Sequence, residues 1–273
     1  MTLYHYTSGN GLFGIINSSE LHCSHQRFLN DPTEQSYFDN VLRSFLNNNE
    51  YLKTIYVELF IRDYLLDSSN QQFIFSLSKN PDSLSMWNYY ANGNGYNIGF
   101  NIDSIIEKND NRLIIEKVEM IYDFTKQQEM VKLFVENNII DYDKYNELTK
   151  QMTKTGDALK FERFKDEQTE IKKSFTKGIN ELKTSFKHAA YKDEEEIRLI
   201  INQSNNGQFK VSGQGIFIEY LTLGMAPDKD IIQIMVHPLS TDLHVEGMKR
   251  FIKSKMPERN VTVIKSEIPF RLI

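Results

Sequence analysis

The sequence has few of the features that mark secreted or membrane-bound proteins. Only one of its 273 residues is a cysteine, Cys23, so no disulfide can form within the chain, which indicates a reducing compartment. No apolar run approaches the roughly 20 residues that span a bilayer. Residues 1–8 lack the basic stretch of a signal peptide. We therefore expect a soluble, cytoplasmic protein with no membrane partner.

Positive charge is not in excess either. The 37 acidic residues outnumber the 32 Lys and Arg, and the net charge of -5 disfavours a general nucleic-acid binder while leaving room for a local basic patch. Hydrophobic residues make up 40% of the chain, including 14 Tyr and 18 Phe. This composition is typical of a globular protein with an aromatic-rich core.

Apolar patterning predicts strands near both ends of the chain and helices between them. Strands are expected over residues 3–6, 72–78, 96–101, 113–122, 197–202, 215–220, 231–236 and 261–266, and helices over 12–16, 41–66, 82–91 and 242–255. Residues 124–187 carry many charges with apolar residues at helical spacing, which predicts two or three amphipathic helices. We expect one α+β domain over residues 1–273, with a sheet core and a helical insertion at 124–187.

Two familiar patterns are present but do not have the right context. Gly9, Gly11 and Gly14 form a G-x-G-x-x-G string, yet the strand before it is short and residues 27–34 form a proline-containing loop, so a Rossmann fold is not expected. His22, Cys23 and His25 resemble a metal cluster, but alternation along a strand would direct His22 away from the other two. We expect no metal site.

Polar residues in two N-terminal segments are candidates for ligand binding. In the strand of residues 3–6, His5 and the following Thr7 share one face, which would be polar. Arg27, Asn30 and Asp31 lie in a dense polar loop with good turn chemistry. A core histidine that bonds to backbone, and a simple Asx turn, are the plain structural alternatives.

A third segment combines hydroxyls with aromatics. Ser76 and Ser78 end the strand of residues 72–78, and Trp87 and Tyr90 follow at positions i and i+3 of a helix, so they share a face. An aromatic core stripe is as consistent with this spacing as a role in stacking on a ligand.

The fourth segment carries the strongest chemical pattern. Glu194, Glu196 and Arg198 alternate at the start of an apolar strand, so one face would present two carboxylates and a guanidinium, with Tyr191 just upstream. A charged, solvent-exposed edge is the alternative. A carboxylate held beside an arginine can keep its charge and stabilise a developing cation.

Taken in order, five segments resemble a large bacterial family of unknown function, domain-of-unknown-function family 2971, over nearly the whole chain. They are LYHYTS at residues 3–8, RFLNDPTE at 27–34, FSLSKNPDSLSMWNYYA at 75–91, KHAAYKDEEEIRLI at 187–200 and SEIPFR at 266–271. The chain departs from the family at His237, where a glycine is usual before the proline, and in a longer helical middle. The same order is similar to the histidine, tyrosine and glutamate arrangement of ADP-ribosyltransferases.

That second resemblance implies a mixed, split sheet and an enzyme that consumes NAD, as a transferase or a glycohydrolase, in a toxin or phage-defence context. His5 would bind the adenosine ribose or anchor the nicotinamide side, and Tyr90 would stack on nicotinamide. Glu196 or Glu194 would hold the ribose 2′-hydroxyl and stabilise the oxocarbenium-like state, and activity is expected to depend most on Glu196. The other ligand contacts would come from Thr7, Arg27, Asn30, Asp31, Ser76, Ser78, Trp87, Tyr191 and Arg198.

The acceptor would be a protein or a nucleic acid. Two other functions fit the same residues. One is a non-catalytic module that binds a nucleotide-like ligand and acts through a partner. The other is a different nucleotide-processing enzyme that uses the carboxylates, with or without a divalent ion.

Overall fold

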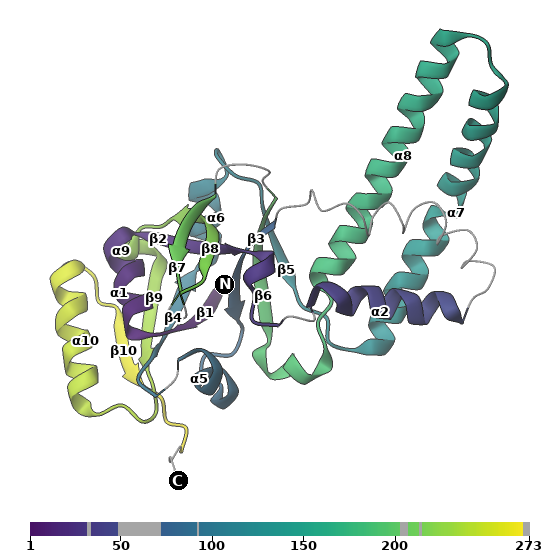
Figure 1. The fold of residues 1–273 in the computed structure, drawn as a ribbon. Helices are drawn as coiled ribbons and strands as arrows, with labels where there is room; N and C mark the ends of the chain where they lie inside the picture. The colour runs from purple at the N-terminus through teal and green to yellow at the C-terminus, as the bar shows by residue number, and fades with distance from the viewer. Residues whose placement is uncertain (32–33, 49–71, 92, 203–206, 213–214, 270–273) are drawn as a thin grey trace. The chain divides into compact units, whose positions relative to one another are not determined.

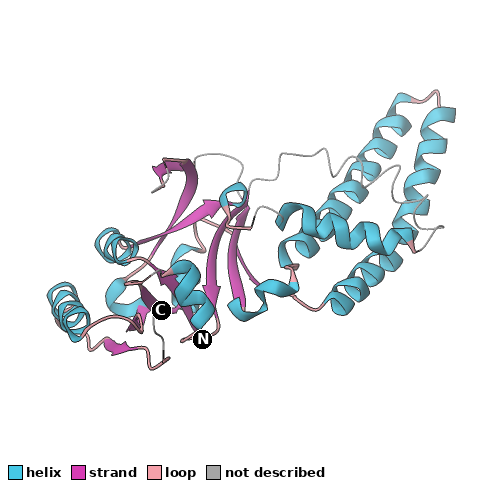
Figure 2. Ribbon diagram, turned by 60° about the horizontal axis from the view of Figure 1, so that its bottom comes forward, coloured by secondary structure: helices cyan, strands magenta, loops and turns pink. Residues whose placement is uncertain are grey.

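Two compact units make up the chain. The computed structural model describes residues 1–31, 34–48, 72–91, 93–202, 207–212 and 215–269. Unit 1 comprises residues 1–30, 70–119 and 190–273, and unit 2 comprises residues 31–69 and 120–189. The strands lie in unit 1, and unit 2 is helical where it is described (Figures 1 and 2). A single domain, in the sense of one cooperatively folding body, stays a prediction, as does the status of residues 124–187 as an insertion.

Unit 1 contains one mixed sheet and the short helices packed on it. Its strands are β1 (Thr2–Thr7), β2 (Glu20–His25), β3 (Gln72–Ser78), β4 (Tyr96–Asn101), β5 (Ile115–Glu119), β6 (Glu196–Asn202), β7 (Gln208–Val211), β8 (Phe217–Gly224), β9 (Ile231–Val236) and β10 (Thr262–Lys265). Its helices are α1 (Gly9–Ser18), η1 (Gln26–Phe28), α5 (Leu84–Tyr90), α6 (Ile102–Asn109), η3 (Ala189–Glu194, whose first residue belongs to unit 2), α9 (Pro227–Asp230) and α10 (Asp242–Lys255).

The sheet forks at β3. Strand β6 pairs with β3 along its whole length, from Gln72 to Ser78. The opposite edge of β3 is shared: β2 pairs only near Phe73 and Ile74, and β1 pairs only at Ser78. Beyond the fork one branch continues from β1 through β4 and β9 to β10, and the other from β2 through β8 to β7. Because β9 and β10 are parallel while the other pairs are antiparallel, the α+β fold with a mixed, unclosed sheet is confirmed.

Alternation along the strands separates an apolar face from a more polar one. The main core includes Phe73, Phe75 and Leu77 of β3 and is covered by apolar residues of α1, α6 and α10. On the other face α5 packs through Trp87 against Tyr6. Strand β2 follows the expected alternation, since Cys23 and His25 are buried on one side while the His22 ring packs on Tyr220 on the other.

The glycine string after β1 opens a helix but does not build a dinucleotide-binding fold. Strand β1 has antiparallel neighbours on both sides, so no parallel β–α–β unit surrounds the string. The Ser8 hydroxyl caps α1 by accepting a hydrogen bond from the Gly11 backbone N–H at 3.1 Å. A Cβ at Gly11 would lie 2.2 Å from Oγ1 of Thr7, so close packing on β1 explains that glycine.

Unit 2 consists of α2 (Glu34–Asn47), α7 (Phe124–Lys154) and α8 (Ala158–Ser185) around a core of their own. Asp123 caps α7 and Asp157 caps α8 through side-chain oxygens that accept backbone N–H groups. The fully buried Gln127 amide donates to two backbone carbonyls and accepts the Tyr37 hydroxyl at 2.9 Å. The prediction of amphipathic helices over residues 124–187 is confirmed, and there are two of them.

The expected elements at 72–78, 96–101, 231–236 and 242–255 have the predicted bounds. The strand expected at 113–122 is shorter, and β2, β7, α6 and α9 were not predicted. Helix α2 ends at Asn47, and the rest of the helix expected at 41–66 falls largely outside the described residues. Among the helices that the structure describes, none is long and apolar enough to cross a bilayer.

Candidate functional site

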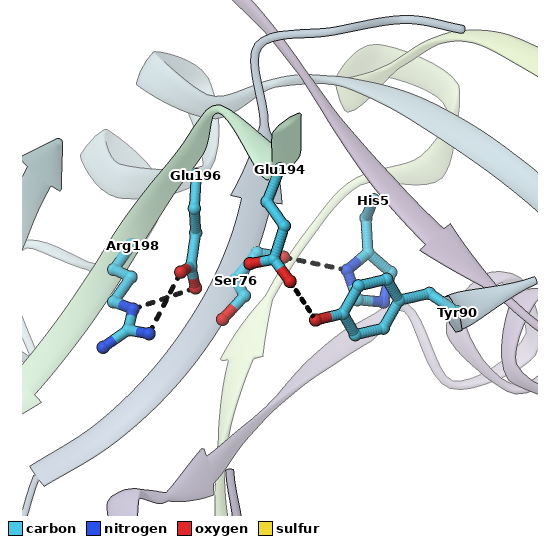
Figure 3. A network of polar contacts seen from close by, with 6 residues as sticks. All are labelled: His5, Ser76, Tyr90, Glu194, Glu196 and Arg198. Atoms are coloured by element: carbon cyan, nitrogen blue, oxygen red, sulfur yellow. Dashed lines mark hydrogen bonds and ion pairs between the residues drawn. The ribbon is translucent and has the colours of Figure 1, made fainter. Parts of the chain in front are cut away.

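The fork in the sheet leaves backbone groups of β3 that no strand pairs, and a histidine fills this place. Nδ1 of His5 lies 3.0 Å from the carbonyl oxygen of Ser76 (Figure 3). A carbonyl can only accept, so Nδ1 carries the proton and donates, and Nε2 is left as an acceptor. The His5 ring also stacks on Phe75, with the ring centroids 4.5 Å apart. The unpaired edge of β3 between β1 and β2 therefore explains why a polar residue, His5, lies inside β1.

Burial determines the charge of His5. The pKa of His5 is lowered from 6.5 to about 4, chiefly by desolvation; the hydrogen bond to Ser76 raises it in part, and the positive charge of Lys210 adds to the lowering. His5 is consequently neutral near pH 7. It can offer a ligand a hydrogen-bond acceptor at Nε2 but no positive charge.

The face of β1 that carries His5 and Thr7 is not the polar face that the sequence predicts. Tyr4 pairs with Ser78, and Ser78 pairs with Glu196, so these residues project from one face of the sheet. His5 follows Tyr4 and belongs to the opposite face, together with Phe75 of the main core. The face that His5 shares with Thr7 is thus the core side of β1, and His5 reaches the fork through the sheet edge.

Tyr90, at the end of α5, joins the site through its hydroxyl. It donates a 2.8 Å hydrogen bond to Oε1 of Glu194, which is 5% exposed. Desolvation raises the pKa of Tyr90, and the charge of Glu194 raises it further, whereas a side-chain interaction with Asn30 lowers it. The hydroxyl therefore stays protonated at neutral pH and donates to Glu194, which holds that carboxylate next to Tyr90 (Figure 3).

Glu196 and Arg198 form a buried ion pair on β6. Nε of Arg198 lies 2.8 Å from Oε1 of Glu196, and Nη2 lies 3.0 Å from Oε2, which is a bidentate arrangement. The two residues are 4% and 3% exposed. The guanidinium thus already compensates the carboxylate that the resemblance marks as catalytic. Glu194 is the carboxylate that accepts the hydrogen bond of the Tyr90 hydroxyl.

A backbone irregularity separates the two carboxylates. Glu195 has a φ of 43°, in the left-handed region that costs a non-glycine residue about 1–2 kcal/mol. Its carbonyl accepts the Lys79 N–H at 3.0 Å. The expected alternation of three charged residues along one strand is therefore wrong: Glu194 belongs to η3, and only Glu196 and Arg198 alternate on β6.

The hydroxyls and the tryptophan near the fork divide into accessible and structural groups. Ser76 is partly exposed, whereas Ser78 is fully buried and accepts the Asn80 N–H at 3.0 Å. Trp87 is also fully buried, and its indole N–H donates to Asp82 at 2.6 Å. Trp87 is a core residue here, so the idea that it stacks on a ligand is corrected, and Tyr90 remains the aromatic candidate.

The other proposed ligand contacts are more dispersed. Arg27 is exposed in η1, and its backbone N–H donates a hydrogen bond to Nδ1 of His25 at 3.2 Å. Asn30 reaches Tyr90, while the buried Asp31 begins unit 2. Tyr191 lies half-buried in η3, three residues before Glu194.

One residue near the fork escaped the sequence analysis. Lys210 of β7 lowers the pKa of His5, and its own pKa is lowered by desolvation. Its ammonium lies 5.3 Å from the centre of the Tyr220 ring. Residues 208–211 are too few to show a strand pattern, so the sequence carries no signal that would have identified β7 or Lys210.

The expectation of no metal site stays a prediction. Within the described ranges no three His, Cys, Asp or Glu side chains gather as ion ligands would. Glu196 accepts a hydrogen bond from a guanidinium, and Glu194 accepts one from a phenol hydroxyl.

The comparisons with known proteins give a match to one family model over part of the chain. No curated protein and no solved structure matches the chain significantly. Residues 86–199, from α5 to β6, match the model of a family described as protein of unknown function (DUF2971). This match includes Tyr90, Glu194, Glu196 and Arg198, and it supports the resemblance of the chain to that family.

Proposed function

We propose that this chain consumes NAD as an ADP-ribosyltransferase or an NAD glycohydrolase, with its site at the fork of the sheet. The observation that supports the proposal is a pair of hydrogen bonds that join distant segments on the strands next to the fork. His5 of β1 bonds to Ser76 of β3, and Tyr90 of α5 bonds to Glu194 just before β6. These are the histidine, the tyrosine and one of the two glutamates that the resemblance assigns to such a site.

The chemistry asked of these residues is modest. The bond between C1′ of the ribose and the nicotinamide nitrogen breaks, and both electrons leave with nicotinamide, which departs neutral. Positive charge then develops on C1′ and the ring oxygen, and water or an acceptor nucleophile adds there and releases a proton. A carboxylate near C1′ stabilises that charge, and it also holds the 2′-hydroxyl by accepting its hydrogen.

The contacts of the carboxylates assign them different parts in this proposal. Glu194 bonds to the Tyr90 hydroxyl, so a nicotinamide stacked on Tyr90 would place its ribose beside Glu194. Glu196 is held by both nitrogens of Arg198 and supports the strand on which the site is built. Glu194 is then the carboxylate closest to the reacting carbon, and Glu196 is a positioning residue.

The test is release of nicotinamide from NAD by the purified chain, followed by chromatography, with Glu194→Gln and Tyr90→Phe as variants. We expect Glu194→Gln to lower turnover at least about 100-fold with little change in KM, as for the loss of one electrostatic contact in a transition state. Glu195→Gln is the matched control, because Glu195 is exposed and adjacent. Unchanged turnover in Glu194→Gln would reject this residue as the catalytic carboxylate.

A second function, a non-catalytic nucleotide-binding module, is favoured by one observation. Both oxygens of Glu196 bond to Arg198, so Glu196 would stabilise a cation poorly and catalysis would depend on Glu194 alone. Calorimetry with NAD and ADP-ribose separates the two functions. Binding of either compound by a chain that releases no nicotinamide, with or without candidate acceptors, would replace the enzyme by the binding module.

A further inference from the structure

Positive charge is concentrated near the C-terminal end of unit 1. Residues 249–265 contain six basic residues and one acid, a net charge of +5 in a chain whose total is -5. The basic residues are Lys249, Arg250, Lys253, Lys255, Arg259 and Lys265, and the acid is Glu258. They occupy the second half of α10, the turn after it and β10. The rest of the chain therefore carries a net charge of -10, so this segment is opposite in sign to its surroundings.

Four of these cations line two adjoining hollows. The larger has a volume of about 620 Å³, and Lys249, Lys253 and Arg259 contribute to its wall together with the polar Asn260 and Thr262. The smaller has a volume of about 420 Å³, and Lys255 and Arg259 line it together with two acids, Asp228 and Glu258. Because the hollows share Pro257, Glu258 and Arg259, they form one extended depression, which we call the basic groove.

The structure of α10 does not account for these charges. Lys253 and Lys255 in the last turn suit the helix dipole, but Lys249 lies earlier and Arg259 lies beyond the helix. Lys249 and Lys253 are four residues apart, a like-charged pair that disfavours a helix. Within the described part of unit 1 no ion pair is formed by the four lysine and arginine side chains that line the basic groove. An anionic ligand would remove this repulsion.

An aromatic pair, one ring exposed and the other partly buried, lies near the basic groove on the side of α1. Phe13 is 57% exposed, and its ring stacks on Phe251 of α10 with centroids 5.5 Å apart. Nζ of Lys255 lies 6.0 Å from the centre of the Phe251 ring. Lys255 lines the smaller hollow, as does Ile16, one helical turn after Phe13. A cation over one ring, with a solvent-exposed ring stacked on it, is a combination by which proteins hold phosphates and stack bases.

We propose that the basic groove binds single-stranded nucleic acid, with the phosphates on Lys249, Lys253, Lys255 and Arg259 and a base on Phe13. Two joined hollows fit an extended polyanion better than one phosphate, and an exposed ring can stack only on unpaired bases. The strand needs no sequence readout, because every base has a face that stacks. This inference is independent of NAD consumption and stands on the charges and contacts around α10.

The experiment is fluorescence anisotropy of a labelled 15-nucleotide oligouridylate with the whole chain, at 50 to 200 mM NaCl. In the triple variant Lys249→Gln, Lys253→Gln, Arg259→Gln we expect affinity at 100 mM NaCl to fall at least 10-fold. The slope of log K against log salt should shrink by about 2, since each phosphate contact to a single strand contributes about 0.7. Phe13→Ala should weaken binding about five-fold or more, as for one lost stacking contact.

The control triple is Lys150→Gln, Lys154→Gln, Lys160→Gln, which removes the same charge from exposed helix residues of unit 2. It should change affinity less than two-fold. Equal losses in the two triples would show a net-charge effect and overturn the proposal. So would absence of binding at 50 mM NaCl, even if vesicles of phosphatidylserine bind, and so would complete displacement by ATP at an equal phosphate concentration, which would indicate a small-phosphate site. Unchanged fluorescence of the buried Trp87 in each variant verifies the fold.

Discussion

Removing the charge of Glu196 tests whether the buried ion pair on β6 stabilises the protein. In Glu196→Gln the guanidinium of Arg198, 3% exposed, loses the anion that contacts it at 2.8 and 3.0 Å. Loss of one partner of a buried pair costs about 3–5 kcal/mol, and Gln keeps one acceptor oxygen, so we expect about 3 kcal/mol. This is a large part of the roughly 5–15 kcal/mol that stabilises a typical fold.

Trp87 makes the measurement direct. It is the single tryptophan and is fully buried in unit 1, so its fluorescence follows the unfolding of that unit in urea. With a slope of about 2 kcal/mol per molar urea, a loss of 3 kcal/mol lowers the midpoint by about 1.5 M. The control Glu195→Gln, at an exposed neighbour, should shift it by less than about 0.3 M. A midpoint for Glu196→Gln that also lies within about 0.3 M of that of the native chain would refute the reasoning.

The double variant separates an ion pair from two independent residues. Arg198→Met alone leaves Glu196 as an uncompensated buried charge, and we expect a cost of at least about 3 kcal/mol. Combined with Glu196→Leu, the total loss should be smaller than the sum of the single losses by about 2 kcal/mol or more. Additive losses would mean that the two side chains stabilise the strand independently.

Three further outcomes follow from the fork and the turn after α5. Because the pKa of His5 is about 4 when folded and about 6.5 when unfolded, only the unfolded chain gains a proton as pH falls from 6.5. The native chain should therefore lose about 1–2 kcal/mol of stability between pH 6.5 and 5 that His5→Gln does not lose; parallel urea midpoints would contradict this. Gly95→Ala should destabilise the protein by about 2 kcal/mol or more, because its Cβ would lie 2.4 Å from the backbone oxygen of Ala91. In the control Gly14→Ala the new Cβ meets nothing within 4 Å, and the substitution should stabilise α1 by about 0.5–1 kcal/mol. Tyr90→Phe removes the hydrogen bond to Glu194 and should cost about 1 kcal/mol in the same urea assay, with an unchanged midpoint as the contrary result.

Local pattern was sufficient for most of the fold. The strands at 72–78, 96–101 and 231–236 and the helix at 242–255 follow from alternation, apolar runs and helical spacing, and their bounds were predicted. The two long helices of unit 2 follow from the same periodicity. Helix α6 was missed because its eight residues follow β4 directly, with no turn residue between them. Strand β7 was missed because four residues are too few for a pattern.

The candidate site shows which facts only the tertiary structure could decide. The sequence determined the residue types: a histidine in an apolar strand, a tyrosine at a helix end and a pair of glutamates beside an arginine. It could not reveal that β3 loses a strand partner at Ser76, which brings His5 to that carbonyl. Nor could it reveal the left-handed Glu195, which sends Glu194 to Tyr90 and leaves Glu196 to Arg198. Long-range pairing and one backbone dihedral, neither of which is encoded in local periodicity, decided the partners of both carboxylates.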